Sequence, residues 1–147
     1  MDALTLLKKD HATVKDILER LEDCEDSRER EELFHRLKDE LHDHETIEEE
    51  IFYPTLKQYA KAKDVVLEGY EEHQVVDYII EDMNELPVDD DTWSAKLAVA
   101  RENIEHHIKE EEGTMFKHAR KAFDEDELEA IGDRMQERKL ELQMSHH

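Results

Sequence analysis

Histidine and glutamate recur along the chain at a spacing that can bind a metal ion. The segment HDHETIEEEIFYP places His44 four residues before Glu48, and HHIKEEEGTMFK repeats the spacing with His107 and Glu111. Residues four apart lie on one face of an α-helix, so each pair can direct an imidazole nitrogen and a carboxylate oxygen toward one point. These donors suit iron, manganese or zinc. The sequence thus offers two candidate ligand pairs.

Two further histidines interrupt apolar stripes elsewhere in the chain. Apolar residues that advance by steps of three and four predict a helix with one buried face. His11 falls on such a stripe, whose members are Leu4, Leu7, His11, Val14, Leu18 and Leu21. His73 falls on another, with the members Val66, Tyr70, His73, Asp77 and Ile80. Both histidines are therefore expected to face the core of a helix bundle.

The segments that carry these side chains are predicted to be long helices. The 147 residues include only three glycines and two prolines, which favours helices over strands. Asp26, followed by Glu29, is a start signal for the second helix, and Asp64 is one for the third. The second and fourth stripes contain the two His–Glu pairs: Phe34, Leu37, Leu41, His44, Glu48 and Ile51, then Trp93, Leu97, Ala100, Ile104, His107, Glu111 and Thr114 or Met115.

The order of these helices predicts an all-α fold. We expect an antiparallel up-down-up-down four-helix bundle over residues 1–122, an architecture that builds cofactor sites from side chains on facing helices. A fifth helix should open at Asp124, with Glu127 in capping-box spacing. Residues 123–147 are predicted to form this helix and a tail within the same domain, as a lid or an interaction segment. The helix has no inward histidine or acid, and its apolar positions are Leu128, Ile131 and Met135.

In such a bundle, six ionisable side chains would converge in one layer of the core: His11, His44, Glu48, His73, His107 and Glu111. Burial without compensation would cost more than the roughly 5–15 kcal/mol that stabilises a small domain. One or two dications would supply the compensation. The alternative for each His–Glu pair is a plain helix ion pair of about 0.2–0.5 kcal/mol. Inward histidines on all four helices favour the metal site.

The remaining histidines and the neighbouring glutamates are assigned to other places. The histidines expected on the surface, or as partners of the ligands, are His35, His42, His106, His118, His146 and His147. The glutamates expected on solvated helix faces are Glu49, Glu50, Glu110 and Glu112. A register error of one position would bring His42 or His106 into the core instead.

The composition excludes several classes of partner. Charged residues make up 42% of the chain and the formal net charge is −22, so a nucleic-acid backbone would be repelled. No run approaches the ~18 apolar residues of a membrane span, and the N-terminal MDALTLLKKDH lacks the cationic start of a signal peptide. We therefore expect a cytoplasmic protein without membrane contact. The single cysteine, Cys24, cannot form an internal disulfide and is interpreted as an incidental thiol.

The four histidine segments together resemble the hemerythrin-like, or HHE cation-binding, domain family. The resemblance spans residues 4–120 through LLKKDHATVK, HETIEEEIFYP, YEEHQVVDYII and HHIKEEEGTMFK, with Tyr53 and Phe116 each nine residues after a histidine. It implies the antiparallel hemerythrin bundle and two iron ions in an oxo- or hydroxo-bridged di-iron centre. By this resemblance one iron would be held by His11 and His44, the other by His73 and His107, and the bridging carboxylates would be Glu48 and Glu111.

One position departs from the pattern of the oxygen-carrying hemerythrins, and another matches a different member of the family. Those proteins have a histidine four residues after the histidine of the third helix, where this chain has Asp77. Glu45 matches a glutamate that helps to hold iron in the hemerythrin domain of an F-box ubiquitin-ligase subunit. Glu45 and Asp77 are thus further candidate ligands. The resemblance implies binding of O₂, peroxide or nitric oxide for sensing or detoxification. The alternatives are a di-iron peroxidase, catalase-like or oxidase enzyme, and an iron store or iron-responsive interaction module.

Overall fold

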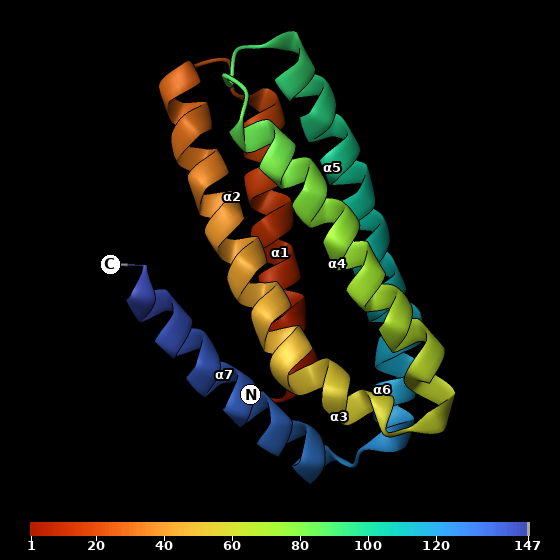
Figure 1. The fold of residues 1–147 in the computed structure, drawn as a ribbon. Helices are drawn as coiled ribbons and strands as arrows, with labels where there is room; N and C mark the ends of the chain where they lie inside the picture. Colours follow the sequence, from red (N-terminus) through yellow and green to blue (C-terminus); the bar gives the residue numbers. More distant parts are fainter. Residues whose placement is uncertain (147) are drawn as a thin grey trace.

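The computed structural model describes residues 1–146 and consists of helices arranged as a bundle (Figure 1). Its four long helices are α1 (Ala3–Asp23), α2 (Ser27–Ile47), α4 (Lys63–Asn84) and α5 (Asp91–Glu110). The shorter segments are η1 (Glu48–Phe52), α3 (Tyr53–Lys57), η2 (Ala60–Ala62), η3 (Glu111–Met115) and α6 (Phe116–Ala122), and α7 (Glu125–Ser145) follows them. The predicted all-α bundle with an additional C-terminal helix is confirmed.

Local sequence signals explain where most of these helices begin. The Asp26 carboxylate accepts a hydrogen bond from the Glu29 backbone amide at the start of α2. Asp124 and Glu127 form the complete capping box predicted for the last helix. The prediction for α4 was wrong by two residues: Ala62 is the N-cap, without a side-chain bond, because the 3₁₀ turn of η2 leads directly into the helix. Asp64 lies in the first turn, where its charge suits the helix dipole.

The hydrophobic core is divided into two clusters by a layer of polar residues. On α1, Leu7 belongs to the cluster that also contains Phe52 and Phe116, whereas Val14 belongs to the cluster around Trp93. His11 lies between Leu7 and Val14 on α1 and is itself buried. Close packing above and below holds the polar layer in a fixed geometry.

Helix α7 packs across the outer face of α1 and α2 (Figure 1). Its apolar residues Leu128, Ile131 and Met135 are buried, as predicted, and join the core cluster around Phe52. A Cβ atom added at Gly132 would lie 2.2 Å from the Met1 carbonyl oxygen, so the close approach of α7 to the N-terminus requires glycine. The helix thus shares the core of the bundle.

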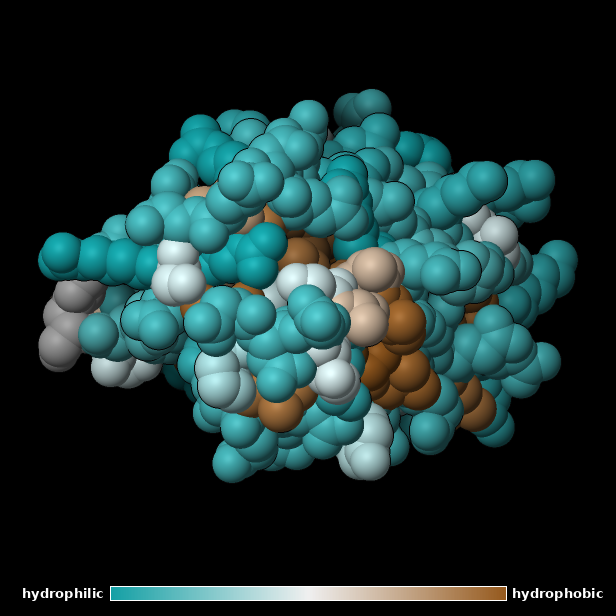
Figure 2. Space-filling model, turned by 90° about the horizontal axis from the view of Figure 1, so that it is seen from above, coloured by the Kyte–Doolittle hydropathy of each residue, from teal (hydrophilic) through white to brown (hydrophobic). Residues whose placement is uncertain are grey.

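The surface is dominated by charged side chains, in keeping with 42 acidic and 20 basic residues. Seen from above in Figure 2, the molecule is mostly hydrophilic, with small hydrophobic areas between the polar side chains. Over residues 1–146, no helix combines the length and the apolar character needed to cross a membrane.

Candidate metal centre

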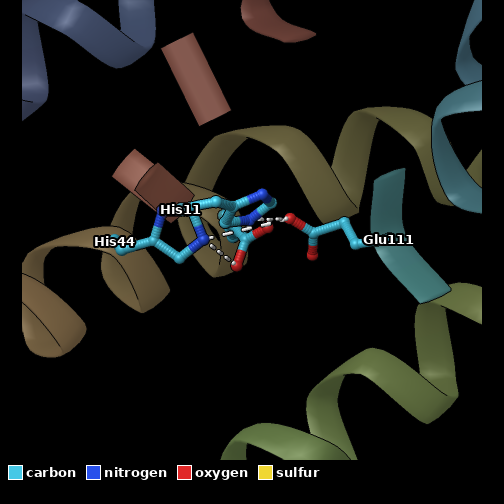
Figure 3. Close-up of side chains that lie close together, drawn as sticks. His11, His44 and Glu111 are labelled. Carbon is cyan, nitrogen blue, oxygen red and sulfur yellow. Dashed lines mark hydrogen bonds and ion pairs between the residues drawn. The ribbon is translucent and has the colours of Figure 1, made fainter. Parts of the chain in front are cut away.

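The six residues predicted to converge do lie together at the centre of the bundle. The exposed fraction of each is 7% or less: His11, His44, Glu48, His73, His107 and Glu111. Figure 3 shows three of the side chains, from α1, α2 and η3, pointing toward one another. The neighbours His42 and His106 are exposed. The helix register inferred from the apolar stripes therefore matches the structure.

The donor atoms of this layer fall into two groups that share carboxylates. In the first group, His11 Nε2 lies 3.0 Å from Glu111 Oε1, and His44 Nε2 lies 3.1 Å from Glu48 Oε1. In the second, Glu48 Oε1 lies 3.0 Å from the Nε2 atom of His73, and Glu111 Oε2 lies 3.1 Å from that of His107. The donor atoms of His11, His44, Glu48 and Glu111 lie within 4.8 Å of one another, and so do those of Glu48, His73 and His107. Each glutamate therefore reaches both histidine pairs.

The other ring nitrogen of every central histidine meets a carboxylate outside the layer. The Nδ1 atoms of the four histidines lie 2.6–3.0 Å from these outer carboxylates: Glu112 at His11, Asp10 at His44, Glu49 at His73 and Glu72 at His107. Such contacts fix the ring orientation and direct each Nε2 atom at the centre. The expectation that Glu49 and Glu112 only face solvent was wrong. Asp10 and Glu72 were missed, although each directly precedes a central histidine in the sequence.

Two π-helical turns explain why consecutive glutamates reach one histidine. η1 begins at Glu48 and η3 begins at Glu111, each directly after an α-helix. A π turn contains one residue more than an α turn and is often found at functional sites. In η1 the first glutamate contacts His73 Nε2 and the second contacts Nδ1 of the same ring. In η3 the first and second glutamates contact His11 in the same way. Apolar stripes read at 3.6 residues per turn do not show that two consecutive glutamates contact one histidine.

The aromatic residues that follow the two π turns make the halves of the site chemically different. The Tyr53 hydroxyl donates a hydrogen bond of 2.8 Å to Glu111 Oε2 and lies 3.4 Å from the Nε2 atoms of His73 and His107. Burial raises the pKa of this phenol well above its ordinary value. At the matching position Phe116 has no hydroxyl group, and its ring stacks on His11 and packs against Phe52. From the sequence, Tyr53 was expected as part of a family pattern but not as a site residue.

Glycine on α4 provides the space for this tyrosine. A Cβ atom added at Gly69 would lie 2.9 Å from the Tyr53 hydroxyl oxygen and 3.0 Å from the ring carbon that carries it. These distances are shorter than van der Waals contact, so a larger residue would displace the phenol. Gly69 therefore allows the Tyr53 hydroxyl to reach the site.

The electrostatics of the layer favour charged imidazoles when no metal is bound. Burial alone would lower the pKa values of the His73 and His107 rings. Hydrogen bonds with carboxylates instead raise the pKa of His73 to about 9 and that of His107 to about 10. The pKa of His44 is likewise raised well above its usual value, despite burial, by neighbouring carboxylates. Burial would raise the pKa of Glu111, but hydrogen bonds with Glu48 and two histidines hold it well below its usual value. A dication would replace the Nε2 protons.

The two further candidate ligands lie at the edge of the layer. Glu45 is buried, and burial together with the neighbouring carboxylate of Asp77 raises the pKa of its carboxyl group to about 9. Donor atoms of Glu45, Glu49 and His73 lie within 4.8 Å of one another, which makes a third possible ligand group. Asp77 is exposed rather than inward and lies outside the three donor groups of the described residues. Metal binding by either residue stays a prediction.

The other histidines among residues 1–146 lie outside the central layer. His35 is exposed beside Asp39, and His146 contacts the buried Asp43 at 2.9 Å, which ties the end of α7 to α2. His118 is partly buried, and its ring lies beside that of Tyr59. His147 lies outside the described residues.

The donor set fits bound metal cations. His44 Nε2 lies 3.1 Å from Glu48 Oε1 but is not directed at it as in a hydrogen bond, so this nitrogen and Glu48 Oε2 are buried without a hydrogen-bond partner, whereas buried polar atoms normally have one. Both belong to the central layer, where a cation would satisfy them. Four imidazoles and shared carboxylates suit iron, manganese or zinc, and the single cysteine, Cys24, belongs to the hydrophobic cluster on the far side of Val14.

Comparison with known proteins agrees with this geometry. A crystal structure of a hemerythrin HHE cation binding domain-containing protein from Mycobacterium kansasii superimposes with a TM-score of 0.87 at 26% identity, covering 99% of this chain and 89% of that chain. No curated protein sequence gives a significant match. The model of the hemerythrin HHE cation binding domain matches residues 2–119. The chain belongs to the hemerythrin HHE cation-binding domain family.

Proposed function

We propose that the protein holds two iron ions in its central layer and binds O₂ or a related small oxidant, peroxide or nitric oxide, for sensing or detoxification. The observation that carries this proposal is the pair of buried donor groups joined by Glu48 and Glu111. Bound iron would supply redox chemistry and an open coordination position. A family that binds cations in this fold supports the assignment.

The four central histidines and the two shared glutamates would hold the two ions. One ion would take the Nε2 atoms of His11 and His44, and the other those of His73 and His107. The two glutamates would bind both ions, since each already lies near both histidine pairs. The Tyr53 hydroxyl points at the second pair and offers an additional oxygen donor on that side alone.

The space beside the histidines favours a very small ligand. A cavity of about 20 Å³ is lined by the four central histidines, by Glu45 and by aliphatic residues of all four long helices: Val14, Leu41, Val76, Ile104 and Ile108. This volume is about enough for one water-sized molecule. An organic substrate or a mineral iron core would not fit, and the aliphatic lining suits an uncharged diatomic or peroxide.

One observation favours the enzymatic alternative, a di-iron peroxidase, catalase-like or oxidase activity. The Tyr53 hydroxyl donates a hydrogen bond inside the site, whereas Phe116 at the matching position has no such group. A phenol in this place can donate a proton to a ligand that binds in the cavity. Turnover of hydrogen peroxide above the background of free iron, lost in Tyr53→Phe, would favour this alternative over simple binding.

The test is metal analysis together with optical spectra of anaerobically purified protein. We expect about two irons per chain, and a spectral change when O₂, peroxide or nitric oxide is added. A preparation that takes up one zinc ion and refuses iron would contradict the proposal. The double variant His44→Ala/His107→Ala is the control, because it should bind little iron and show no oxidant-dependent spectrum.

A further inference from the structure

The cavity beside the histidines is lined by matching positions of the two halves of the bundle. Val14 on α1 and Val76 on α4 each lie three residues after the histidine of their helix. Leu41 on α2 and Ile104 on α5 each lie three residues before theirs. The lining is therefore nearly symmetric, and a difference between matching positions gives the two sides different properties.

The position directly after the histidine breaks this symmetry. On α5 it is Ile108, which is 4% exposed, and on α2 it is Glu45, which is 9% exposed. Asp77, an exposed residue of α4, lies beside Glu45 and lines the same surface groove. One side of the cavity is thus closed by an aliphatic side chain. The other is closed by a carboxyl side chain that has an exposed carboxylate as its neighbour.

A groove on the surface adjoins the cavity on the glutamate side. The groove has a volume of about 300 Å³ and lies between α2 and α4, with Lys38, His42, Asp77 and Ile80 among its lining residues. Leu41 and Glu45 line both the groove and the cavity. These two side chains therefore form the wall between the surface groove and the space beside the histidines.

We propose that small oxidants reach the metal centre from the α2–α4 groove, past Leu41, when the side chain of Glu45 moves aside and so acts as the gate. This inference rests on the proposed function, because it concerns access of a ligand to that site. When the Glu45 carboxyl group swings out of the wall into the groove, it becomes hydrated and stays near Asp77. Movement of Ile108 on the opposite side would expose aliphatic surface to water, which is unfavourable.

The decisive experiment compares Leu41→Ala with Ile104→Ala, two truncations at matching positions of the cavity wall. The probe is nitric oxide, an uncharged diatomic, mixed anaerobically with the iron-loaded ferrous protein in a stopped-flow spectrometer. We expect Leu41→Ala to accelerate binding about tenfold and Ile104→Ala to change it by less than about twofold, because only the first truncation opens the wall to the groove. Equal acceleration, or a greater one in Ile104→Ala, would overturn the proposed route.

A second variant tests the gate itself. Glu45→Ile places at this position the residue type found at position 108, and should slow nitric oxide binding to the iron that remains bound about tenfold. The rate is measured on the iron-bound fraction, so the result does not depend on the iron content of the variant. An unchanged rate in that fraction would contradict the role of Glu45 as the gate.

A measurement without metal separates the route from the proposed function. In crystals of metal-free Leu41→Ala under xenon pressure, xenon should occupy a continuous path between groove and cavity, because aliphatic cavities bind xenon. Xenon in the cavity with a closed wall on the groove side would overturn the route. If xenon follows the path but iron-loaded protein responds to no small oxidant, the proposed function fails and the access route stands.

Discussion

Iron uptake by the metal-free protein should release protons, and the site geometry sets how many. The Nε2 atoms of His73 and His107 lie 3.0 and 3.1 Å from carboxylate oxygens, and their pKa values are raised to about 9 and about 10. Near neutral pH both rings therefore carry an Nε2 proton. A metal ion bound at these nitrogens must displace both protons.

The size of the effect follows from the two pKa values. Each unit between the pKa and the solution pH costs about 1.4 kcal/mol, so at about pH 7.5 deprotonation costs roughly 2 kcal/mol for His73 and roughly 3 kcal/mol for His107. Together these costs weaken metal binding by about 5 kcal/mol. Because two protons leave, the apparent affinity of this pair should rise about 100-fold per pH unit between about pH 7 and 9 and level off above pH 10.

The assay is calorimetric titration of metal-free protein with ferrous iron under argon, in two buffers with different heats of ionisation. The difference between the two buffers gives the number of protons released, expected to be at least two at about pH 7.5, one from each ring of this histidine pair. In the control Glu72→Gln, His107 loses the charge of its outer carboxylate, so fewer protons should be released. Iron binding without proton release, or with an affinity independent of pH, would refute the reasoning.

Four further outcomes follow from the structure. The melting temperature of metal-free protein should fall as the pH rises from about 6.5 to 10. The raised pKa values of His73 and His107 stabilise the fold fully below about pH 6.5, and this stabilisation is lost as the pH passes about 9 and 10. A melting temperature independent of pH would contradict this. By metal analysis, His107→Ala should lose one iron and the exposed neighbour variant His106→Ala should keep two. Tyr53→Phe should retain iron but alter the optical spectrum, and an unchanged spectrum would argue against a role of the phenol. Gly132→Val should lower the unfolding free energy in urea by about 2 kcal/mol or more, since its Cβ would lie 2.2 Å from the Met1 carbonyl oxygen.

The sequence by itself determined the helices and which side chains face inward. Stripes of apolar residues report the face that each helix buries, because burial of that face stabilises the bundle whichever helix covers it. The inward placement of His44 and His107, rather than His42 and His106, could therefore be predicted. The capping box that starts the last helix is also local, since its partners are three residues apart.

Only the tertiary structure decided which groups meet across helices. Asp10 precedes His11 in the sequence yet bonds the ring of His44, because the partner of a side chain depends on the relative shift of two packed helices. The π turn at Glu48 adds a residue to the helix and brings Glu49, like Glu48, to the ring of His73. A uniform period of 3.6 residues does not predict this contact. Such contacts arise from packing between distant segments, so no pattern along the chain specifies them.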